Sequence, residues 1–376
     1  MPIYVDVSAA VHRRAGLGRY AESLTRALNA QAPGRLALFY NREQGIAPLA
    51  GLEALPSSTV ALGYKPWRMA VWAGQVAGLD FGRLLPGAEL FHATEHLLLP
   101  LRRVPTVLTI HDLIFRHLPQ HHKRLNRWYL NWTLPLYCRR ATRIIAVSEQ
   151  TRREVVAAYH IQPERIRVIP EAPAEGFGPA PSARVQAARA RYHLPERYLL
   201  TVGTLEPRKN LVRLLEAWQP LYAAGAAPPL VIAGKPGWLN EAFMAALEHS
   251  PQRAGVVLTG YVPDGDLPAL YGGAEVFVFP SLYEGFGLPP LEAMACGVPV
   301  ACSNASSLPE VVGDAALLFD PLDVSAMRAA LERLSADGNL RAELARCGLE
   351  RSRQFSWAET ARQTLAVYQQ AMEQPR

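Results

Sequence analysis

One stretch of this chain, residues 279–299, constrains its fold more than any other part of the sequence. An apolar run, Val276–Phe279, leads into it and predicts a buried strand, after which a glycine-containing loop and a short helix follow. Prolines in the first turn of that helix, Gly297 at its end and Pro299 beyond it are typical of how helices start and stop. The stretch therefore predicts a strand, a loop and a helix in direct succession.

The loop of this stretch has the character of an anion site. Gly285 and Gly287 lie just before the helix, where unpaired N–H groups and the helix dipole favour a phosphate. Two acids, Glu284 in the loop and Glu292 in the helix, flank that site. Because carboxylates repel a phosphate, they need another partner, and carboxylates accept hydrogen bonds from vicinal hydroxyls. We therefore expect these two acids to bind a sugar.

Both halves of the chain alternate short apolar runs with longer helical patterns, which predicts parallel strands joined by helical crossovers. At 376 residues the chain exceeds one ordinary core, so two domains are expected. We predict two doubly wound, Rossmann-like α/β domains, residues 1–176 and 177–355, and a final helix within 356–376 that packs back on the first domain. Ligands bind in the crevice at the carboxyl ends of such sheets, so polar residues that follow strands are site candidates.

The same patterns place the individual elements. The expected strands are residues 3–7, 36–40, 90–93, 106–110, 143–147, 167–169, 198–202, 230–233, 256–258, 276–279, 298–302 and 316–319. The expected helices are residues 18–30, 124–140, 149–159, 211–221, 241–249, 267–271, the segment after 287, 324–336, 340–354 and 357–372. A segment rich in Pro, Ala and Gly, residues 170–181, predicts a linker.

Composition narrows the class of protein. Hydrophobic residues at 49% and charged residues at 19% are typical of a soluble globular protein. No run of 18 or more apolar residues appears, and the first residues resemble a strand rather than a signal peptide. The four cysteines have no C-x-x-C spacing, so a disulfide framework or a zinc site is not expected. We expect a cytoplasmic protein.

The net charge of +6 is unevenly distributed. Residues 1–180 carry 22 of the 39 Lys and Arg but only 13 of the 33 Asp and Glu, so the rest of the chain is slightly acidic. Two explanations stay open: an anionic partner such as a membrane surface, a phosphorylated acceptor or a nucleic acid, or a solvated arginine-rich surface. Within this half, residues 123–143 interleave arginines with tryptophans and tyrosines. That segment could lie on a membrane or stack on nucleic acid, but we favour an amphipathic crossover helix with its aromatic residues in the core.

Two loops that follow expected strands offer groups for a phosphate. Gly16 and Gly18 precede a helix and could let a ligand approach the backbone, although glycines that only form a turn are equally compatible. Arg208 and Lys209 lie side by side after another strand. There they could neutralise a diphosphate, Arg208 through a bidentate contact and Lys209 as a point charge. An exposed basic pair is the alternative, which we disfavour.

Histidines gather at the ends of expected strands in the first half. His111 is the first strongly polar residue after an apolar strand, with Asp112 beside it, so we favour a functional role over a histidine satisfied by a backbone carbonyl. His92 and His96 follow or flank another strand end, and with Asp112 they are candidates for the acceptor side. None of these histidines has the paired spacing of a helical zinc motif, so no metal site is expected.

The D-x-D pattern at Asp264 and Asp266 is typical of a Mn²⁺ or Mg²⁺ ion held with a nucleotide-sugar. Because it lies in a turn, we interpret it instead as helix-start chemistry with Asp266 as the N-cap.

Taken together, these motifs resemble the glycosyltransferases of family four, which have the GT-B fold. The resemblance rests on Glu284 and Glu292 as E-x₇-E, on residues 206–210, on Gly16 and on His111, and it extends over essentially the whole chain. It is strongest over residues 198–321, which include the matching runs 260–261 and 308–315. It implies a metal-independent enzyme without a cofactor that transfers a sugar from a nucleoside-diphosphate sugar and retains the anomeric configuration.

The resemblance also implies a role for each candidate. The catalytic groups would be Glu284, beside the donor sugar, with His111, Arg208 and Lys209. The donor would contact Gly16, Thr204, Arg208, Lys209, Gly260, Tyr261, Val262, Glu284, Gly285, Phe286, Gly287, Leu288 and Glu292, with Glu292 on the ribose and residues 260–262 beside the base. Many relatives have arginine near the position of Thr204, so the diphosphate contacts are expected to depend more on Arg208.

The resemblance to mannosyltransferases of surface-polysaccharide and lipopolysaccharide synthesis favours GDP-mannose as donor and a glycan or lipid-linked glycan as acceptor. A UDP-sugar-dependent glucosyl- or GlcNAc-type transferase, or a GT-B epimerase or phosphorylase, remains an alternative. The basic first half would suit peripheral contact with an anionic membrane, at the inner face of the cytoplasmic membrane. A nucleic-acid-binding protein is disfavoured because it leaves the strand-end motifs unexplained.

Overall fold

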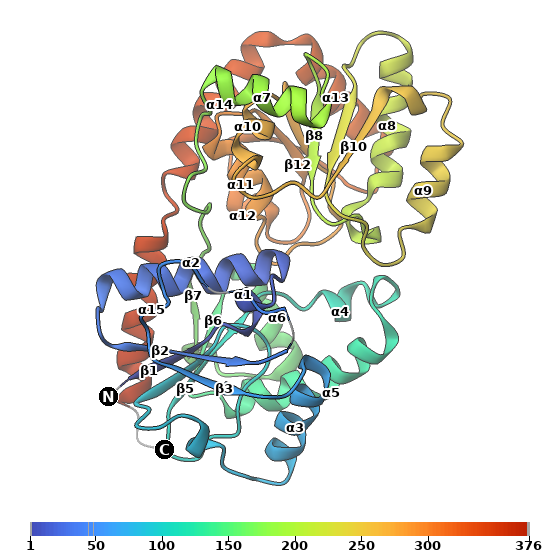
Figure 1. Ribbon diagram of the computed structural model, residues 1–376. Helices are drawn as coiled ribbons and strands as arrows, with labels where there is room; N and C mark the ends of the chain where they lie inside the picture. The colour runs from blue at the N-terminus through green and yellow to red at the C-terminus, as the bar shows by residue number, and fades with distance from the viewer. Residues whose placement is uncertain (1, 44, 48, 374–376) are drawn as a thin grey trace. The chain divides into compact units, whose positions relative to one another are not determined.

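The computed structural model describes residues 2–43, 45–47 and 49–373 of the chain (Figure 1). The chain forms two compact units. The first unit contains Met1–His117, His122–Glu171 and Ser356–Arg376, and the second contains Leu118–His121 and Ala172–Phe355. The change from the first unit to the second falls between residues 171 and 172, inside the segment whose composition predicts a linker.

The first unit is built on a seven-stranded parallel sheet with the order β3-β2-β1-β4-β5-β6-β7. Its strands are β1 (Ile3–Asp6), β2 (Leu36–Asn41), β3 (Ser57–Val60), β4 (Leu90–Ala93), β5 (Thr106–Ile110), β6 (Arg143–Ala146) and β7 (Ile166–Val168). The central strands β1, β4 and β5 are buried throughout, as expected for a parallel sheet covered on both faces. The strand order reverses between β1 and β4, which marks the edge where doubly wound sheets bind ligands.

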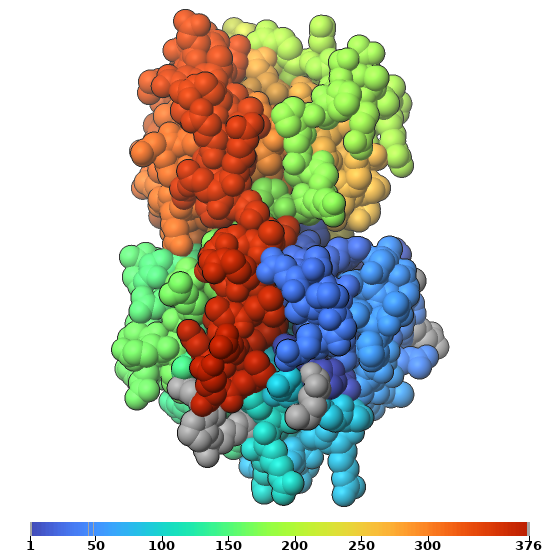
Figure 2. All heavy atoms as spheres, turned by 90° about the vertical axis from the view of Figure 1, so that its left-hand side faces the viewer, coloured from blue at the N-terminus to red at the C-terminus, as the bar shows by residue number. Residues whose placement is uncertain are grey.

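The helices of the first unit cover both faces of this sheet. They are α1 (Ser8–Val11), α2 (Ala15–Gln31), α3 (Tyr64–Val76), α4 (Ile114–His117), α5 (Arg124–Arg140), α6 (Glu149–Tyr159) and α15 (Trp357–Met372), with short 3₁₀ turns η1 (Gly82–Leu84) and η3 (Pro163–Arg165). The last helix, α15, lies alongside α2 (Figure 2). The Tyr368 hydroxyl of α15 is 2.6 Å from His92 Nδ1, and Thr360 Oγ1 donates to Pro170 O at 2.9 Å. The C-terminal segment thus belongs to the core of the first unit.

The second unit repeats the architecture with a six-stranded parallel sheet in the order β10-β9-β8-β11-β12-β13. Its strands are β8 (Leu199–Val202), β9 (Leu230–Ala233), β10 (Val256–Gly260), β11 (Val276–Phe279), β12 (Val300–Ser303) and β13 (Ala316–Phe319). Its helices are α7 (Ser182–Tyr192), α8 (Leu211–Ala223), α9 (Glu241–Glu248), α10 (Leu267–Gly272), α11 (Leu288–Ala295), α12 (Leu308–Val312), α13 (Val324–Ala336) and α14 (Gly338–Ser352), with 3₁₀ turns η2 (Pro119–His121), η4 (Pro207–Lys209) and η5 (Arg253–Gly255). Here the strand order reverses between β8 and β11.

Six of the described strands and α-helices have no counterpart among those expected from the sequence: β3, α1, α3, α4, α7 and α12. Strand β3 is a partly exposed edge strand of sequence Ser-Ser-Thr-Val, which carries no apolar run. Helix α7 is rich in Arg and Ala and buries only Ala188, so it has almost no apolar stripe. Strand β3 and helix α7 escape sequence patterns because the patterns detect burial, and these two segments are buried little. Helices α1, α4 and α12 have only four or five residues, too few to show a helical period.

Gly16 and Gly18 do not lie in a loop before a helix, as expected, but in the first turn of α2. The loop itself holds the short helix α1, which packs against α2. Gly18 makes this contact possible, because a Cβ atom at that position would lie 2.8 Å from the carbonyl oxygen of Ala9. Gly16 is exposed, and a Cβ atom there would meet nothing within 4 Å.

Asp266 precedes α10 as expected, but its side chain does not cap the helix. Its carboxylate Oδ2 instead accepts hydrogen bonds from the Tyr192 hydroxyl at 2.6 Å and from Arg191 Nη1 at 2.9 Å, which join α10 to α7. Among the described residues, no group of three or more His, Cys, Asp or Glu side chains is placed to hold a metal ion. No helix in the described part of the chain has the length and apolar character needed to cross a membrane.

The two glycines of α2 give a matched test of this packing. The change Gly18→Ala forces α1 and α2 apart and is expected to lower the free energy of unfolding by about 1–3 kcal/mol. The change Gly16→Ala, two residues away and in open space, is expected to leave stability unchanged or to raise it by up to about 1 kcal/mol. Urea unfolding followed by circular dichroism measures both, and equal effects of the two changes would contradict the packing argument.

Candidate active site

Two loops meet at the carboxyl edge of the second sheet, where β8 and β11 lie side by side. The loop after β8 carries Arg208 and Lys209 in η4, and the loop after β11 carries Glu284. The N–H of Leu282 donates to Arg208 O at 2.8 Å, and Asn210 Nδ2 donates to Pro280 O at 3.1 Å. The structure thus joins residues that are about seventy positions apart in the sequence.

An ion cluster occupies the junction of these loops. One oxygen of Glu284, Oε1, contacts Lys209 Nζ at 2.6 Å, Arg208 Nη1 at 2.5 Å and the Ser281 hydroxyl at 2.5 Å. Arg208 Nε also pairs with Glu206 Oε1 at 2.5 Å. Two cations and two carboxylates therefore balance within the cluster. The side chains of Glu284 and Lys209 are only 11% and 10% exposed, so this pairing takes place largely away from water.

The cluster fixes the ionisation of its members. Burial alone would raise the pKa of Glu284, but Arg208 and Lys209 oppose it and lower the pKa to about 2. Burial and the neighbouring guanidinium of Arg208 lower the pKa of Lys209, while Glu284 and Glu206 act in the opposite direction. Glu284 is therefore a carboxylate at neutral pH. A ligand phosphate entering here would compete with Glu284 for the two cations.

Serine side chains hold the loop that carries Glu284. The N–H of Glu284 donates to Ser306 Oγ at 2.8 Å, and the Ser307 hydroxyl contacts Glu284 O at 2.9 Å and Phe286 O at 2.6 Å. Sequence reasoning did not single out these serines, because no local pattern links them to a loop twenty residues earlier. Within the described part of the chain, the N–H groups of Phe286 and Gly287 have no hydrogen-bond acceptor.

Gly287 is the N-cap residue of α11 and has a φ of +123°, which side-chain-bearing residues rarely adopt. A Cβ atom there would also lie 2.7 Å from Leu308 Cδ2. The next residue, Leu288, is buried, and the prolines that follow it carry no N–H. Donors for an anion at this helix start therefore come from the loop and Leu288. Gly285 lies in the same loop.

Glu292 lies inside α11, and its residue is 1% exposed. The Tyr271 hydroxyl of α10 donates to Glu292 Oε2 at 3.1 Å. The two acids of the E-x₇-E motif therefore have different surroundings: Glu284 belongs to the ion cluster, and Glu292 to a buried contact between two helices.

The remaining donor-side candidates lie at neighbouring strand ends. Gly260 ends β10, Tyr261 is 67% exposed, and Val262 is buried. Thr204 is half-buried in the loop after β8. That loop pairs with the loop after β9, because the N–H of Leu205 donates to Lys235 O at 3.0 Å.

In the first unit, His111 directly follows β5 and is buried. Its Nδ1 lies 3.0 Å from Glu171 Oε1, and its Nε2 lies 2.9 Å from Thr94 O. Both partners are acceptors, so this geometry suits a cationic ring with hydrogen on both nitrogens. Burial opposes this charge, but the contact with Glu171 outweighs it and raises the pKa of His111. A sugar could reach a ring nitrogen of His111 only by displacing one of these partners.

The other first-unit candidates differ in accessibility. His92 is fully buried between Tyr368 and Thr109, and burial lowers its pKa to about 3. Its placement on the acceptor side does not fit this position, because both ring nitrogens are already bonded within the core. His96 and Asp112 are half-buried, and Asp112 Oδ1 accepts the N–H of Ile114 at 3.0 Å.

A pair of buried acids beside these histidines was not recognised from the sequence. Asp6 ends β1 and Glu95 follows β4, so they share the carboxyl edge of adjacent strands. Asp6 Oδ2 and Glu95 Oε1 have no hydrogen-bond partner in the described structure, and Arg14 Nη1 contacts Glu95 Oε2 at 2.8 Å. Burial and the charge of Glu95 raise the pKa of Asp6 to about 7. An acid at the end of each neighbouring strand is the signal that could have revealed the pair.

Comparison with known proteins identifies the class of protein to which this chain belongs. The family description "Glycosyl transferases group 1" matches residues 186–351, and "Glycosyltransferase Family 4" matches residues 14–172. The chain is also similar in structure to a sucrose-phosphate synthase from Thermosynechococcus elongatus, with a TM-score of 0.78 over 98% of this chain and 99% of that one, at 22% identity. The fold is therefore GT-B, with two Rossmann-like domains.

Two curated relatives fix the family. O-antigen chain mannosyltransferase B of Escherichia coli is 39% identical over 272 residues, which cover 72% of this chain and 71% of the relative. The serotype-specific mannosyltransferase WbdA of Escherichia coli is 37% identical over 275 residues, which cover 70% of this chain. The match spans only 33% of WbdA, about a third of its length. The chain belongs to glycosyltransferase family 4, and it is a glycosyltransferase.

The ion cluster predicts a pH dependence of stability. Because the pKa of Glu284 is lowered from 4.5 to about 2, its contribution is fully present above pH 4.5 and is lost as the pH falls toward about 2. Glu284→Gln is neutral at every pH and removes the carboxylate that pairs with Lys209, which costs roughly 3 kcal/mol at neutral pH. The difference in melting temperature between wild type and Glu284→Gln is therefore expected to shrink as the pH falls through this window.

Two further variants control this measurement. Glu241→Gln, at an exposed acid of the same unit, is expected to show no such pH-dependent difference. Adding Lys209→Met to Glu284→Gln removes one unpaired cation and is expected to recover part of the lost stability. A difference that stays constant down to acid pH would contradict the assigned ion cluster.

Proposed function

We propose that this glycosyltransferase moves mannose from GDP-mannose to a glycan or lipid-linked glycan acceptor of surface-polysaccharide synthesis, with retention of configuration. The cluster of Glu284 with Arg208 and Lys209 at a sheet edge is the observation that carries the catalytic part of this proposal. The sugar is supported by the names of the two relatives, which are mannosyltransferases with an O-antigen or serotype role.

The donor diphosphate would be bound by Arg208 and Lys209. Both cations contact Glu284, in the loop that also carries the N–H groups of Phe286 and Gly287. A diphosphate is a stronger partner for them than one carboxylate. Stabilising the charge that grows on the leaving diphosphate is the largest contribution such groups can make to transfer. Binding would therefore draw the cations away from Glu284.

Glu284, released from its cations, would accept hydrogen bonds from the hydroxyls of the transferred sugar. Within the ion cluster its pKa is about 2, so Glu284 meets the donor as a carboxylate and would also stabilise positive charge on the sugar ring. Glu292 would bind the ribose, and the exposed ring of Tyr261 would lie against the base. His111, bonded to Glu171, remains our candidate for a sugar-contacting group of the first unit.

We propose that transfer requires neither a metal ion nor a cofactor. The cationic side chains supply the charge that a metal would otherwise bring to the diphosphate. Of the D-x-D acids, Asp266 also has other partners, since it is bonded to Tyr192 and Arg191.

Mannose transfer is tested directly with radiolabelled donor and a lipid-linked glycan fraction as acceptor. GDP-mannose is expected to support transfer, UDP-glucose is not, and EDTA is expected to leave the rate unchanged. Transfer from UDP-glucose alone would replace the proposed donor. A loss of activity in EDTA that Mn²⁺ restores would assign a metal role to Asp264 and Asp266.

Variants of the ion cluster test the site. Glu284→Ala and Arg208→Ala are each expected to lower the transfer rate at least about a hundredfold, because each removes charge stabilisation of the transition state. Arg341→Ala, an ion-paired arginine of the same unit outside the cluster, serves as the matched control. Circular dichroism verifies folding, and near-normal turnover by a folded Arg208→Ala protein would refute the assignment.

A further inference from the structure

Helix α5 exposes large apolar side chains on the face opposite its core contacts. Its tyrosines, Tyr129 and Tyr137, are buried, which fits the expected amphipathic crossover helix. Its tryptophans do not: Trp128 is 51% and Trp132 is 65% exposed, and Leu125 is 85% exposed. These three lie at positions i, i+3 and i+7, which form one stripe along a helix. The expectation that all aromatic residues of this segment are core is therefore wrong for the tryptophans.

Helix α3 presents a second stripe beside the first. Met69 is 45% and Val76 is 64% exposed, at positions i and i+7, and Trp72 lies between them on the same face. The rings of Trp72 and Trp128 meet edge to face with centroids 6.3 Å apart, so the two stripes join. We call this surface the apolar ridge; it consists of Met69, Trp72, Val76, Leu79, Leu125, Trp128 and Trp132.

The two helices of the apolar ridge carry basic residues but no acids. No acid occurs in the sequence between Glu53 and Asp80, which includes all of α3, nor between Asp112 and Glu149, which includes all of α5. The basic residues of these two segments are Lys65, Arg68, Arg116, Lys123, Arg124, Arg127, Arg139, Arg140 and Arg143. An apolar surface on two helices whose charged residues are all cations complements an anionic bilayer, whose negative surface attracts Lys and Arg.

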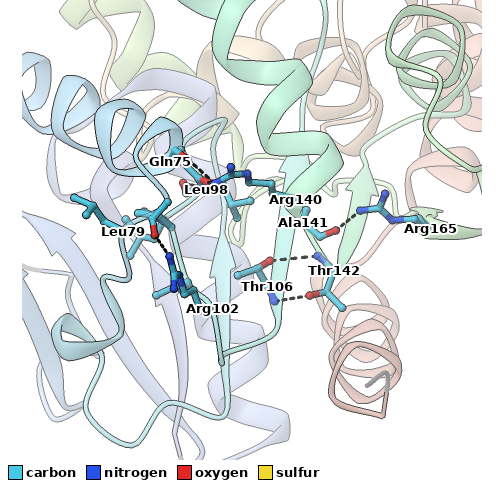
Figure 3. A pocket seen from close by; sticks show the side chains of 13 residues that line it. Gln75, Leu79, Leu98, Arg102, Thr106, Arg140, Ala141, Thr142 and Arg165 are labelled. Atoms are coloured by element: carbon cyan, nitrogen blue, oxygen red, sulfur yellow. Dashed lines mark hydrogen bonds between the residues drawn. The ribbon is translucent and has the colours of Figure 1, made fainter. Parts of the chain in front are cut away.

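A cavity of about 390 Å³ lies at one end of the apolar ridge (Figure 3). Leu79 of the ridge lines it, together with Arg102, Arg140 and Arg165. Thr106, which begins β5, also lines it, so the cavity is at the amino edge of the sheet, opposite His111.

The three arginines of the cavity are bonded to carbonyl oxygens near the ends of α3 and α5. Arg140 Nη1 contacts Gln75 O at 2.6 Å, Arg102 Nη2 contacts Gly78 O, and Arg165 Nη2 contacts Ala141 O. Among the described residues, none of the three is paired with a carboxylate. Asp80, nearby, accepts the N–H groups of Gly82 and Arg102 instead. Each guanidinium has five N–H donors, so donors remain for a phosphate.

We propose that the face formed by α3 and α5 docks on an anionic lipid bilayer, with the apolar ridge in the interface and the arginine cavity holding a lipid phosphate. The proposal deepens the proposed function and rests on it, because a lipid-linked acceptor would bring the enzyme to a membrane. Tryptophan suits the membrane interface because its ring is apolar and its N–H is polar.

The topology gives this docking face a use in transfer. Helix α5 follows β5 and α4 and leads into β6, so it runs from the carboxyl edge of the sheet to the amino edge. Leu125 at its start is therefore near the edge that carries His111 and Asp112. A bilayer along α5 would extend from the arginine cavity to that edge. An acceptor held in the membrane would then lie close to His111 and Asp112.

Vesicle binding by the full-length protein tests the proposal. The protein is expected to sediment with phosphatidylcholine vesicles that contain phosphatidylglycerol and not with phosphatidylcholine alone, and high salt is expected to weaken binding. The emission of Trp128 and Trp132 should shift to the blue on binding. The double change Trp128→Gln and Trp132→Gln is expected to weaken binding about tenfold or more and to abolish this shift.

Control variants distinguish the roles of the apolar ridge and the arginine cavity from the effect of losing apolar or charged side chains elsewhere on the surface. Met244→Gln with Leu318→Gln removes two exposed apolar residues of the second unit and is expected to bind as wild type does. Arg102→Gln with Arg140→Gln is expected to reduce the preference for phosphatidylglycerol about tenfold. Arg346→Gln with Arg362→Gln makes the same charge change at exposed arginines elsewhere and is expected to have little effect.

Several results would overturn the docking face. Binding that is equal for wild type and the tryptophan variant excludes the apolar ridge. Two results together would make the cavity a site for free phosphate: inorganic phosphate prevents the vesicle binding that depends on Arg102 and Arg140, and the tryptophan variant binds vesicles normally. Tight binding to an RNA oligonucleotide without vesicle binding assigns the face to nucleic acid, and a dimer that the tryptophan changes dissociate assigns it to a second copy of the chain.

Activity assays distinguish failure of this inference from failure of the proposed function. The tryptophan variant is expected to transfer mannose normally to a detergent-solubilised acceptor and poorly to the same acceptor in vesicles. Normal transfer in both settings would refute the docking face and leave the proposed function intact. No mannose transfer by a wild-type protein that still binds vesicles would refute the proposed function alone.

Discussion

The pairing of Glu284 with two cations is the interaction on which the rest of the second unit depends. Arg208 and Lys209 lie in one loop and Glu284 in another, and neither loop could keep its charges out of water alone. The parallel sheet brings the loops together by placing β8 beside β11. The same pairing keeps Glu284 ionised and keeps the cations ready for a stronger anion. Stability and chemistry thus rest on one set of charges.

In the first unit, a histidine is the group whose charge would have to be stabilised away from water. His111 is buried, and Glu171 and the carbonyl of Thr94 are placed to accept the two hydrogens of a cationic ring. Below it, His92, Thr109 and Tyr368 form a neutral buried chain that ties α15 to the sheet. The pKa values of these two histidines are therefore shifted in opposite directions, upward only for His111, which has a carboxylate within reach. Only His111 lies directly after a strand, at the edge where ligands bind.

Local sequence patterns predicted the bounds of helices and strands correctly wherever buried residues recur with a regular period. The strands β4, β5, β9, β11 and β13 and the helices α5, α6, α13 and α15 have the bounds that their apolar runs predict. The pattern failed at β3 and α7, which bury little, and at the start of α2, where the contact of Gly18 with Ala9 extends the helix through both glycines. It also misjudged Trp128 and Trp132, because sequence spacing identifies an apolar stripe but cannot tell whether that stripe is covered.

By itself, the sequence determined the two parallel sheets, the strand-loop-helix around residues 279–299, and the residue types of the site, since all of these depend on local spacing. The tertiary structure decided which charges meet. It paired Glu284 with Arg208 and Lys209, and it placed the Tyr271 hydroxyl where it donates to Glu292. It also placed Asp6 near Glu95 at the ends of adjacent strands. Ion pairs and hydrogen bonds form across loops that are distant in the chain, so only the packing of the strands sets their partners, and with them the charge of each group.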